Sequence, residues 1–113
     1  MKKIKVGFIG LGLMGFPMVK NILKKKYTMI VWSRSKKNYM KIQKLGAKTC
    51  KNLKDLPNKC QVIIMMLADD KVCIQISNKL KNQLKKGQIL IDMSSTKKKT
   101  AIKIEKNIRS KAS

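Results

Sequence analysis

Short apolar segments alternate along this chain with longer amphipathic stretches. Residues 28–32 read T-M-I-V-W and residues 61–67 read Q-V-I-I-M-M-L, runs that are too short for a typical helix and are typical of buried strands. Alternation of this kind indicates β-α-β units around a parallel sheet. The pattern predicts strands at residues 5–9, 28–32, 48–50, 61–67 and 88–92, of which 48–50 would be a short edge strand.

Helical periodicity fills most of the gaps between the predicted strands. Residues 36–45 form a predicted helix that Gly46 ends as its C-terminal cap. Apolar residues recur every four positions from Val72 to Leu84, in one or two helices that end at Gly87. The helix predicted at residues 14–26 carries an apolar face of Met14, Met18, Val19, Ile22 and Leu23.

Two further elements complete the pattern. Residues 52–56 form a turn or short helix that Pro57 closes. After the fifth strand, three hydroxyl residues can cap a last helix. The capping hydroxyls are Ser94, Ser95 and Thr96, and the apolar side of that helix comprises Ala101, Ile104 and Ile108.

With 113 residues and 43% apolar content the chain can bury one sizeable core, so we expect a single domain over residues 1–113.

The formal charge of +23 is extreme and raises the question of a polyanionic partner. Of the 28 basic residues, however, only Arg34 and Arg109 are arginines, which base readout and bidentate phosphate recognition favour. The lysines are scattered along the chain, and few aromatic residues are available for stacking on bases. We therefore expect a solvated lysine-rich surface and no nucleic-acid partner.

The N-terminal run from Val6 to Val19 imitates a secretory signal after three lysines. Glycines and Pro17 interrupt it, no small-residue cleavage site follows, and it is too short to span a bilayer. We expect a soluble cytoplasmic protein without a membrane partner. The three cysteines are expected to be buried free thiols rather than zinc ligands, because they lack C-x-x-C spacing and the chain has no histidine; they are Cys50, Cys60 and Cys73.

A glycine motif directly follows the first predicted strand and opens the first predicted helix. It reads Gly10-Leu11-Gly12-Leu13-Met14-Gly15 and matches G-x-G-x-x-G in the context that a dinucleotide site requires. The first glycine permits a tight turn, the second lets the backbone approach a diphosphate, and the third lets the helix pack on the strand. The helix N-terminus then attracts the phosphates. The alternative is that the glycines serve a tight turn alone.

The end of the second predicted strand bears on cofactor choice. An Asp or Glu about 20 residues after the glycine loop normally holds the adenosine ribose of NAD, but the first acidic residue here is Asp55. The position reads Ser33-Arg34-Ser35-Lys36-Lys37, which offers a guanidinium, hydroxyls and ammonium groups to a 2'-phosphate. These residues favour NADP over NAD. The alternative is that Arg34 is an ordinary surface residue.

Four blocks together resemble the beta-hydroxyacid dehydrogenases, the family of 3-hydroxyisobutyrate dehydrogenase, tartronate semialdehyde reductase and the glyoxylate/succinic semialdehyde reductases. They comprise residues 6–15 with the following Met18 and 21–23, residues 31–35, 64–69 and 91–95. The W-S-R-S block at 32–35 most resembles the glyoxylate/succinic semialdehyde reductase branch. The resemblance implies a Rossmann-type doubly wound parallel sheet, cut off before the later strands and the all-helical C-terminal domain.

The resemblance also implies roles for individual residues. Met66 and Leu67 would contact the adenosine-side ribose and phosphates of the cofactor through their backbone. Ser95 would lie near the nicotinamide ribose and the substrate, or would only cap the last helix. The family's catalytic lysine, thought to protonate the carbonyl oxygen, belongs to a segment that this sequence does not contain, so no catalytic residue is identifiable.

The function implied by the resemblance is NADPH-dependent reduction of a small aldehyde acid, or the reverse oxidation of a 3-hydroxy acid. This chain would be the cofactor-binding part, inactive by itself, and a homo-oligomer would form only with the C-terminal domain. Two alternatives remain. One is a non-catalytic NADPH-binding or regulatory module, and the other is a basic nucleic-acid-binding protein.

Overall fold

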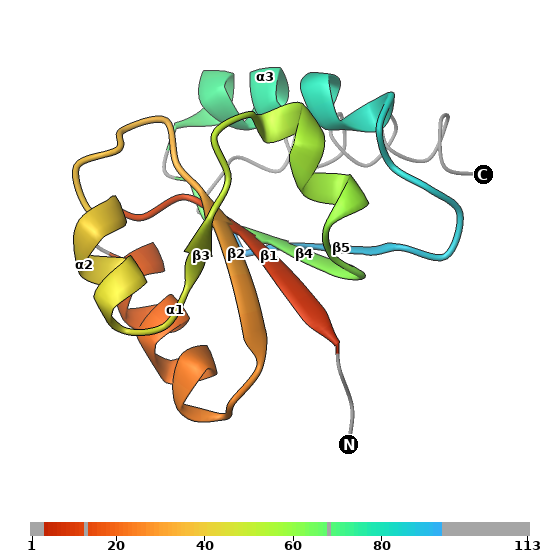
Figure 1. The fold of residues 1–113 in the computed structure, drawn as a ribbon. Helices are drawn as coiled ribbons and strands as arrows, with labels where there is room; N and C mark the ends of the chain where they lie inside the picture. The colour runs from red at the N-terminus through yellow and green to blue at the C-terminus, as the bar shows by residue number, and fades with distance from the viewer. Residues whose placement is uncertain (1–3, 13, 68, 94–113) are drawn as a thin grey trace.

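The computed structural model describes residues 4–12, 14–67 and 69–93, which form a parallel sheet with helices on both faces (Figure 1). Five strands lie in the order β3-β2-β1-β4-β5, the doubly wound Rossmann-type arrangement that was predicted. In chain order the elements are β1 (Lys5–Ile9), α1 (Gly15–Lys24), β2 (Thr28–Trp32), α2 (Tyr39–Lys44), β3 (Lys48–Thr49), the 3-10 helix η1 (Leu53–Asn58), β4 (Val62–Met65), α3 (Asp70–Lys81) and β5 (Ile89–Asp92).

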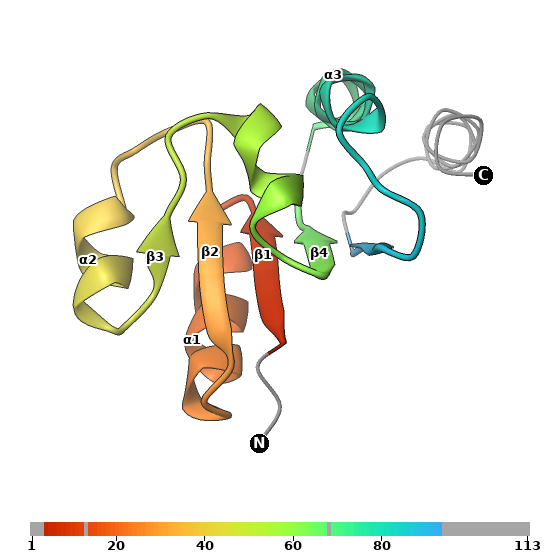
Figure 2. The ribbon, with the colours of Figure 1, turned by 45° about the vertical axis from the view of Figure 1, so that its right-hand side comes forward.

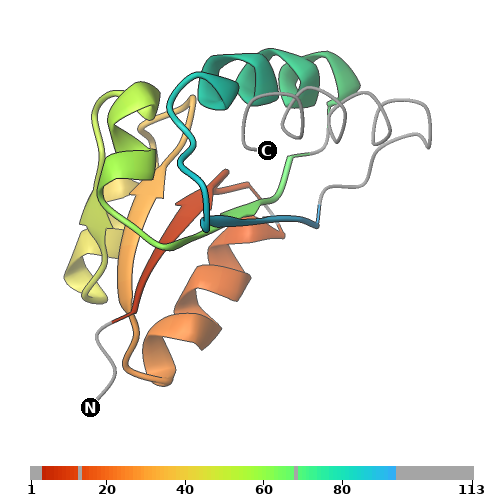
Figure 3. The ribbon, with the colours of Figure 1, turned by 90° about the vertical axis from the view of Figure 1, so that its right-hand side faces the viewer.

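Helices lie on the two faces of the sheet (Figure 2, Figure 3), and the sheet separates two clusters of buried apolar side chains. One layer lies under α1 and α2, where Phe8, Val19 and Ile42 are fully buried. The other lies under η1 and α3, where Leu56 and Leu80 are fully buried. Alternate residues of each central strand serve the two layers, which explains why the sequence shows continuous apolar runs rather than strict alternation.

The predicted strands are confirmed, with small differences at their ends. β1 and β2 begin and end at the predicted residues, and β3 lies at the edge of the sheet as expected. Gly46 ends α2 with a φ of +111°, and its N–H donates to the Gln43 carbonyl at 3.0 Å. This is the left-handed cap conformation that glycine adopts at little steric cost. The last predicted helix lies outside the described residues.

Three details of the helix predictions are wrong. Met14 does not join the buried face of α1, because the helix starts at Gly15 and leaves the Met14 side chain 65% exposed. α2 starts at Tyr39 rather than at residue 36, because residues 36–38 form a turn in which the Tyr39 N–H donates to the Lys36 carbonyl. Pro57 lies inside η1 rather than after it, and its side chain is fully buried.

β5 has one covered and one exposed face. Leu90 pairs in register with Ile63 and packs against the α3 layer. Its alternating neighbours Ile89, Ile91 and Met93 are 56%, 40% and 48% exposed. The side of the sheet that carries α1 is therefore apolar and uncovered by described residues at this edge strand. None of the described helices combines the length and apolar composition needed to cross a membrane.

All three cysteines are buried and free, as predicted. Burial, with a smaller contribution from the nearby Cys50, raises the pKa of Cys60 to about 11, although a hydrogen bond from the Gly7 backbone acts in the opposite direction. The Cys60 thiol donates to the Leu56 carbonyl at 3.2 Å. The folded protein therefore holds this proton more tightly than an unfolded chain, in which the thiol has its ordinary pKa of 9.0.

We predict that Cys60 contributes a pH-dependent part of the stability. Its contribution is complete below pH 9 and is lost as the pH rises from 9 to about 11, because only the unfolded chain readily forms the thiolate there. Urea unfolding at pH 8 and at pH 11 should show the wild type losing roughly 2 kcal/mol more than Cys60→Ala between these values. Lysine titration affects both proteins and cancels in the comparison. Equal losses would contradict the prediction.

Candidate functional site

The turn after β1 is built on two glycines that the fold itself requires. Gly10 has a φ of +108°, and a Cβ placed on it would collide with the Met66 carbonyl oxygen. A Cβ on Gly15 would collide with the Gly10 carbonyl oxygen. Because both positions exclude a side chain, the first turn of α1 lies directly against the end of β1.

Gly12 differs from both of these glycines. No atom lies within 4 Å of where its Cβ would be, and its φ is outside the left-handed region. The protein's own packing therefore does not require glycine there, and the backbone is left open to an approaching ligand. The Gly12 carbonyl accepts the Phe16 N–H at 3.1 Å, and no side chain caps the start of α1 at Met14. The positive end of this helix faces the opening without an acidic residue in its first turn.

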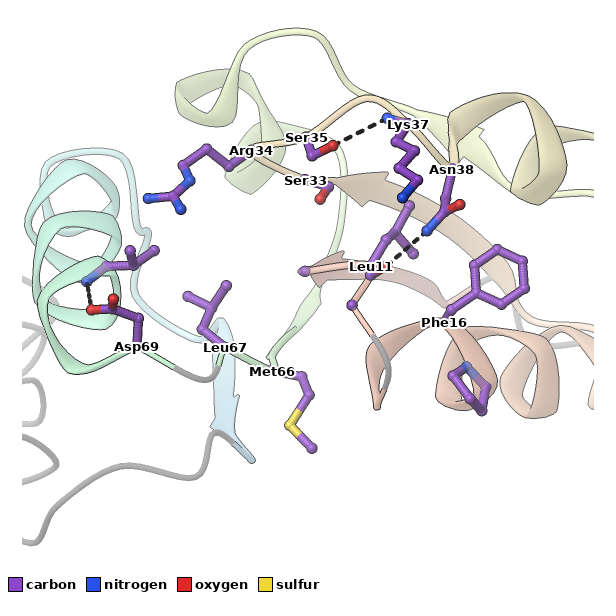
Figure 4. Close-up of a pocket in the computed structure, with 14 residues that line it drawn as sticks. Leu11, Phe16, Ser33, Arg34, Ser35, Lys37, Asn38, Met66, Leu67 and Asp69 are labelled. Carbon is purple, nitrogen blue, oxygen red and sulfur yellow. Dashed lines mark hydrogen bonds between the residues drawn. The ribbon is translucent and has the colours of Figure 1, made fainter.

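A cavity of about 690 Å³ opens beside this turn, where the carboxyl ends of β1, β2 and β4 meet (Figure 4). The Gly10 N–H donates to the Trp32 carbonyl and the Met66 N–H donates to the Ile9 carbonyl, both at 2.9 Å. These bonds hold the three strand ends together at the point where the strand order reverses. The lining residues are Gly10, Leu11, Gly12, Phe16, Pro17, Ser33, Arg34, Ser35, Lys37, Asn38, Met66, Leu67, Asp69 and Val72.

The structure brings together eight of the predicted site residues and separates others from them. Met14 and Gly15 do not line the cavity; Gly15 acts through packing. Leu13 and Ser95 lie outside the described residues. The eight that line the cavity are Gly10, Leu11, Gly12, Ser33, Arg34, Ser35, Met66 and Leu67.

Arg34 extends from the end of β2 along the cavity toward α3 (Figure 4). Its side chain is exposed, and it has no ion pair among the side chains that the structure describes. The neighbouring Ser35 hydroxyl accepts the Lys37 N–H at 3.4 Å, which folds the loop so that Lys37 also lines the cavity. Two cationic side chains are thus available at this end of the cavity.

Lys36, by contrast, is used within the protein. Its Nζ donates to the Ser33 carbonyl at 2.9 Å and lies 5.0 Å from the ring centroids of both Trp32 and Tyr39. The Tyr39 hydroxyl accepts the Ser33 N–H at 2.8 Å and can donate to the Cys50 carbonyl at 3.2 Å. These contacts hold both backbone groups of Ser33, the residue that precedes Arg34, so Lys36 shapes the loop while Lys37 faces the cavity.

Lys37, whose ammonium group the sequence also offers to a 2'-phosphate, is a further lining residue, and the other five were not predicted: Phe16, Pro17, Asn38, Asp69 and Val72. The Asp69 carboxylate accepts the N–H groups of Lys71 and Val72 at 2.8 and 3.2 Å and caps α3. An acidic residue just before the Val72 periodicity is the usual signal for such a cap and could have identified it. The Asn38 side chain donates to the Leu11 carbonyl at 3.1 Å, across 27 residues of sequence, and no local signal predicts this contact.

The arrangement presents a backbone-lined opening at α1 and a cationic loop at β2 on one continuous cavity. An elongated ligand with phosphate groups at two separated points matches this distribution, because amides and a helix dipole hold one group while Arg34 and Lys37 attract the other. Within the described ranges, no three His, Cys, Asp or Glu side chains lie together where they could bind a metal ion.

Comparison with known proteins gives consistent matches over the whole domain. Residues 5–113 match the family model described as the NAD binding domain of 6-phosphogluconate dehydrogenase. Glyoxylate/succinic semialdehyde reductase 1 of Arabidopsis thaliana is 32% identical over 96% of this chain and 38% of its own length. Mitochondrial 3-hydroxyisobutyrate dehydrogenase of Rattus norvegicus is 34% identical over 92% of this chain and 33% of its own length. The chain thus spans less than half of either relative.

Solved structures show the same fold. The Mycobacterium tuberculosis 3-hydroxyisobutyrate dehydrogenase superposes with a TM-score of 0.92 over 98% of this chain and 38% of that protein, at 18% identity. An imine reductase from Myxococcus stipitatus, solved in complex with NADP+, superposes with a TM-score of 0.85 over 94% of this chain and 37% of that protein, at 26% identity.

We predict that alanine at one glycine of the turn lowers the stability of the fold, whereas alanine at another weakens ligand binding. Gly15→Ala should destabilise the fold by about 1–3 kcal/mol, because its Cβ collides with the Gly10 carbonyl. Gly12→Ala should change stability by less than about 0.5 kcal/mol, because its Cβ meets nothing, yet weaken the binding of a pyridine nucleotide by about tenfold or more. Urea unfolding and NADPH fluorescence titration measure the two effects. A Gly12→Ala protein that binds NADPH as tightly as the wild type would show that this nucleotide does not approach the Gly12 backbone.

Proposed function

This chain belongs to the family of the NAD binding domain of 6-phosphogluconate dehydrogenase, and we propose that it is the cofactor-binding part of an NADP-dependent oxidoreductase acting on a small aldehyde acid or 3-hydroxy acid. Binding of a pyridine nucleotide follows from the family, and its curated relatives are dehydrogenases and reductases. The preference for NADP, the substrate class and the division of labour within the enzyme are the proposed parts.

The cofactor preference is proposed from Arg34, which lines the cavity at the end of β2 and has no ion pair with a side chain in the described part of the chain. A 2'-phosphate carries about two negative charges and accepts several charge-assisted hydrogen bonds. The Arg34 guanidinium can donate two parallel bonds to it, with Lys37 as a second cation and Ser35 as a hydroxyl partner. A carboxylate that would instead select the free ribose hydroxyls of NAD is missing from this loop, residues 33–37.

The remainder of the cavity suits the diphosphate and the adenosine of the same ligand. Gly12 leaves the backbone open and the start of α1 supplies amides and a dipole, so the diphosphate needs no charged side chain there. Met66 and Leu67 line the same cavity at the end of β4 and offer apolar and backbone contacts. The nucleotide, when bound, supplies the hydride, and the residues of this chain bind and orient it.

We predict that Arg34 discriminates between the two nucleotides. The wild type should bind NADPH more tightly than NADH, and Arg34→Ala should weaken NADPH binding by roughly 10- to 100-fold while changing NADH binding less than threefold. Fluorescence or calorimetric titration measures both affinities. Lys41→Ala, which removes an exposed charge on α2 that does not line the cavity, is the matched control. An unchanged NADPH to NADH ratio in Arg34→Ala would refute the assignment.

The proposed division of labour concerns the proton transfer that accompanies hydride delivery. The family resemblance places the proton-donating lysine outside residues 1–113, and the nicotinamide side of the site is assigned here only to Ser95. A positioned general acid contributes about 10²- to 10⁴-fold to such a reaction. We therefore propose that residues 1–113 bind the nucleotide but do not by themselves complete the chemistry.

The corresponding prediction is that residues 1–113 bind NADPH without oxidising it. The protein is incubated with saturating NADPH and either glyoxylate or succinic semialdehyde. The absorbance at 340 nm should then fall no faster than in a blank that contains no protein. Binding is verified in the same sample by fluorescence, so that a misfolded preparation is recognised. NADPH oxidation above the blank that is abolished by Gly12→Ala would show that these residues contain a sufficient proton donor.

A further inference from the structure

We infer that Asn38 is a positioning residue that fixes the distance between the two phosphate subsites. Its side chain is the described link between the loop after β2, which carries Arg34 and Lys37, and the glycine turn after β1. The inference rests on the proposed function, since it assigns to Asn38 an effect only on ligands that use both subsites.

The first observation is the direction in which the Asn38 amide points. Nδ2 donates to the Leu11 carbonyl at 3.1 Å, and Leu11 lies between Gly10 and Gly12 and is almost fully buried. The bond therefore ends on the rigid part of the glycine turn rather than on a mobile side chain. Figure 4 shows the Asn38 amide reaching from the loop after β2 to this carbonyl on the wall of the cavity.

The second observation is that the Asn38 side chain does not cap its own helix. Asn38 occupies the N-cap position of α2, where an asparagine commonly accepts a hydrogen bond from its own helix. Here it makes no capping bond, and the helix forms with its side chain turned toward Leu11. The contact between the two loops thus replaces the local bond that sequence position alone would favour.

The physical consequence is preorganisation. A ligand that carries a diphosphate and a 2'-phosphate must find both subsites at one fixed separation, and without the tether it has to order the two loops as it binds. A ligand that carries only one of these groups needs only one loop in place. Loss of the tether should therefore weaken binding of the two-point ligand selectively.

The experiment compares NADP+, NAD+ and 2'-AMP on the wild type, Asn38→Ala and Asn38→Leu. NADP+ uses both subsites, NAD+ lacks the 2'-phosphate, and 2'-AMP lacks the diphosphate. Calorimetric titration should show an approximately tenfold loss of NADP+ affinity in both variants, with NAD+ and 2'-AMP changed by less than about twofold. Asn38→Leu keeps a side chain of similar branched shape without the donor, so agreement of the two variants assigns the effect to the hydrogen bond.

Gln43→Ala is the matched control, because Gln43 also donates through a side-chain amide, to the Thr49 hydroxyl at 2.8 Å, but away from the cavity. It should leave all three affinities unchanged. If the Asn38 variants bind all three ligands more weakly by the same factor, Asn38 has a merely structural role. If their NADP+ affinity is unchanged, the tether is irrelevant to binding. Either result overturns the inference about Asn38 but not the proposed function. A wild type that binds NADP+ no more tightly than NAD+ would overturn both the inference and the proposed cofactor preference.

Discussion

The structure depends on the close approach of backbone to backbone at the carboxyl end of β1. Gly10 turns with a positive φ against the Met66 carbonyl, and Gly15 packs against the Gly10 carbonyl. A side chain at either place would separate β1 from β4 or lift α1 off the sheet. Because β1 is the central strand, this contact determines how three strand ends and one helix meet, and the cavity lies where they do.

Residues that the fold requires can be told apart from residues that only a ligand requires. Gly15 has backbone against it, whereas Gly12 has open space. Lys36 lies by two rings and bonds to the Ser33 carbonyl, whereas Lys37 lines the cavity. The chemistry at the end of β2 therefore does not follow from a net charge of +23, which sets only a general attraction for anions. It follows from the two cationic side chains that line the cavity there, Arg34 and Lys37.

The strands and the glycine turn could be predicted because their signals are local. Burial of β1 and β2 on both faces leaves continuous apolar runs, and two of the turn's glycines, Gly10 and Gly15, occupy positions that only glycine fits. The start of α2 could not, because it depends on Tyr39 contacts with Ser33 and Lys36 that form only in the folded chain. The role of Asn38 depends on a partner 27 residues away and was equally inaccessible. The roles of Leu13 and Ser95 stay predictions.

An exposed guanidinium is a weak basis for specificity unless its surroundings hold it. Solvent and salt screen exposed charges, and a long side chain loses conformational entropy when it binds. The backbone that carries Arg34 needs less ordering, because Tyr39 and Lys36 already hold the residue before it and Asn38 ties its loop to the glycine turn. In the proposed site, selectivity would therefore depend less on the strength of one charge than on the hydrogen bonds that hold its loop in place before the ligand arrives.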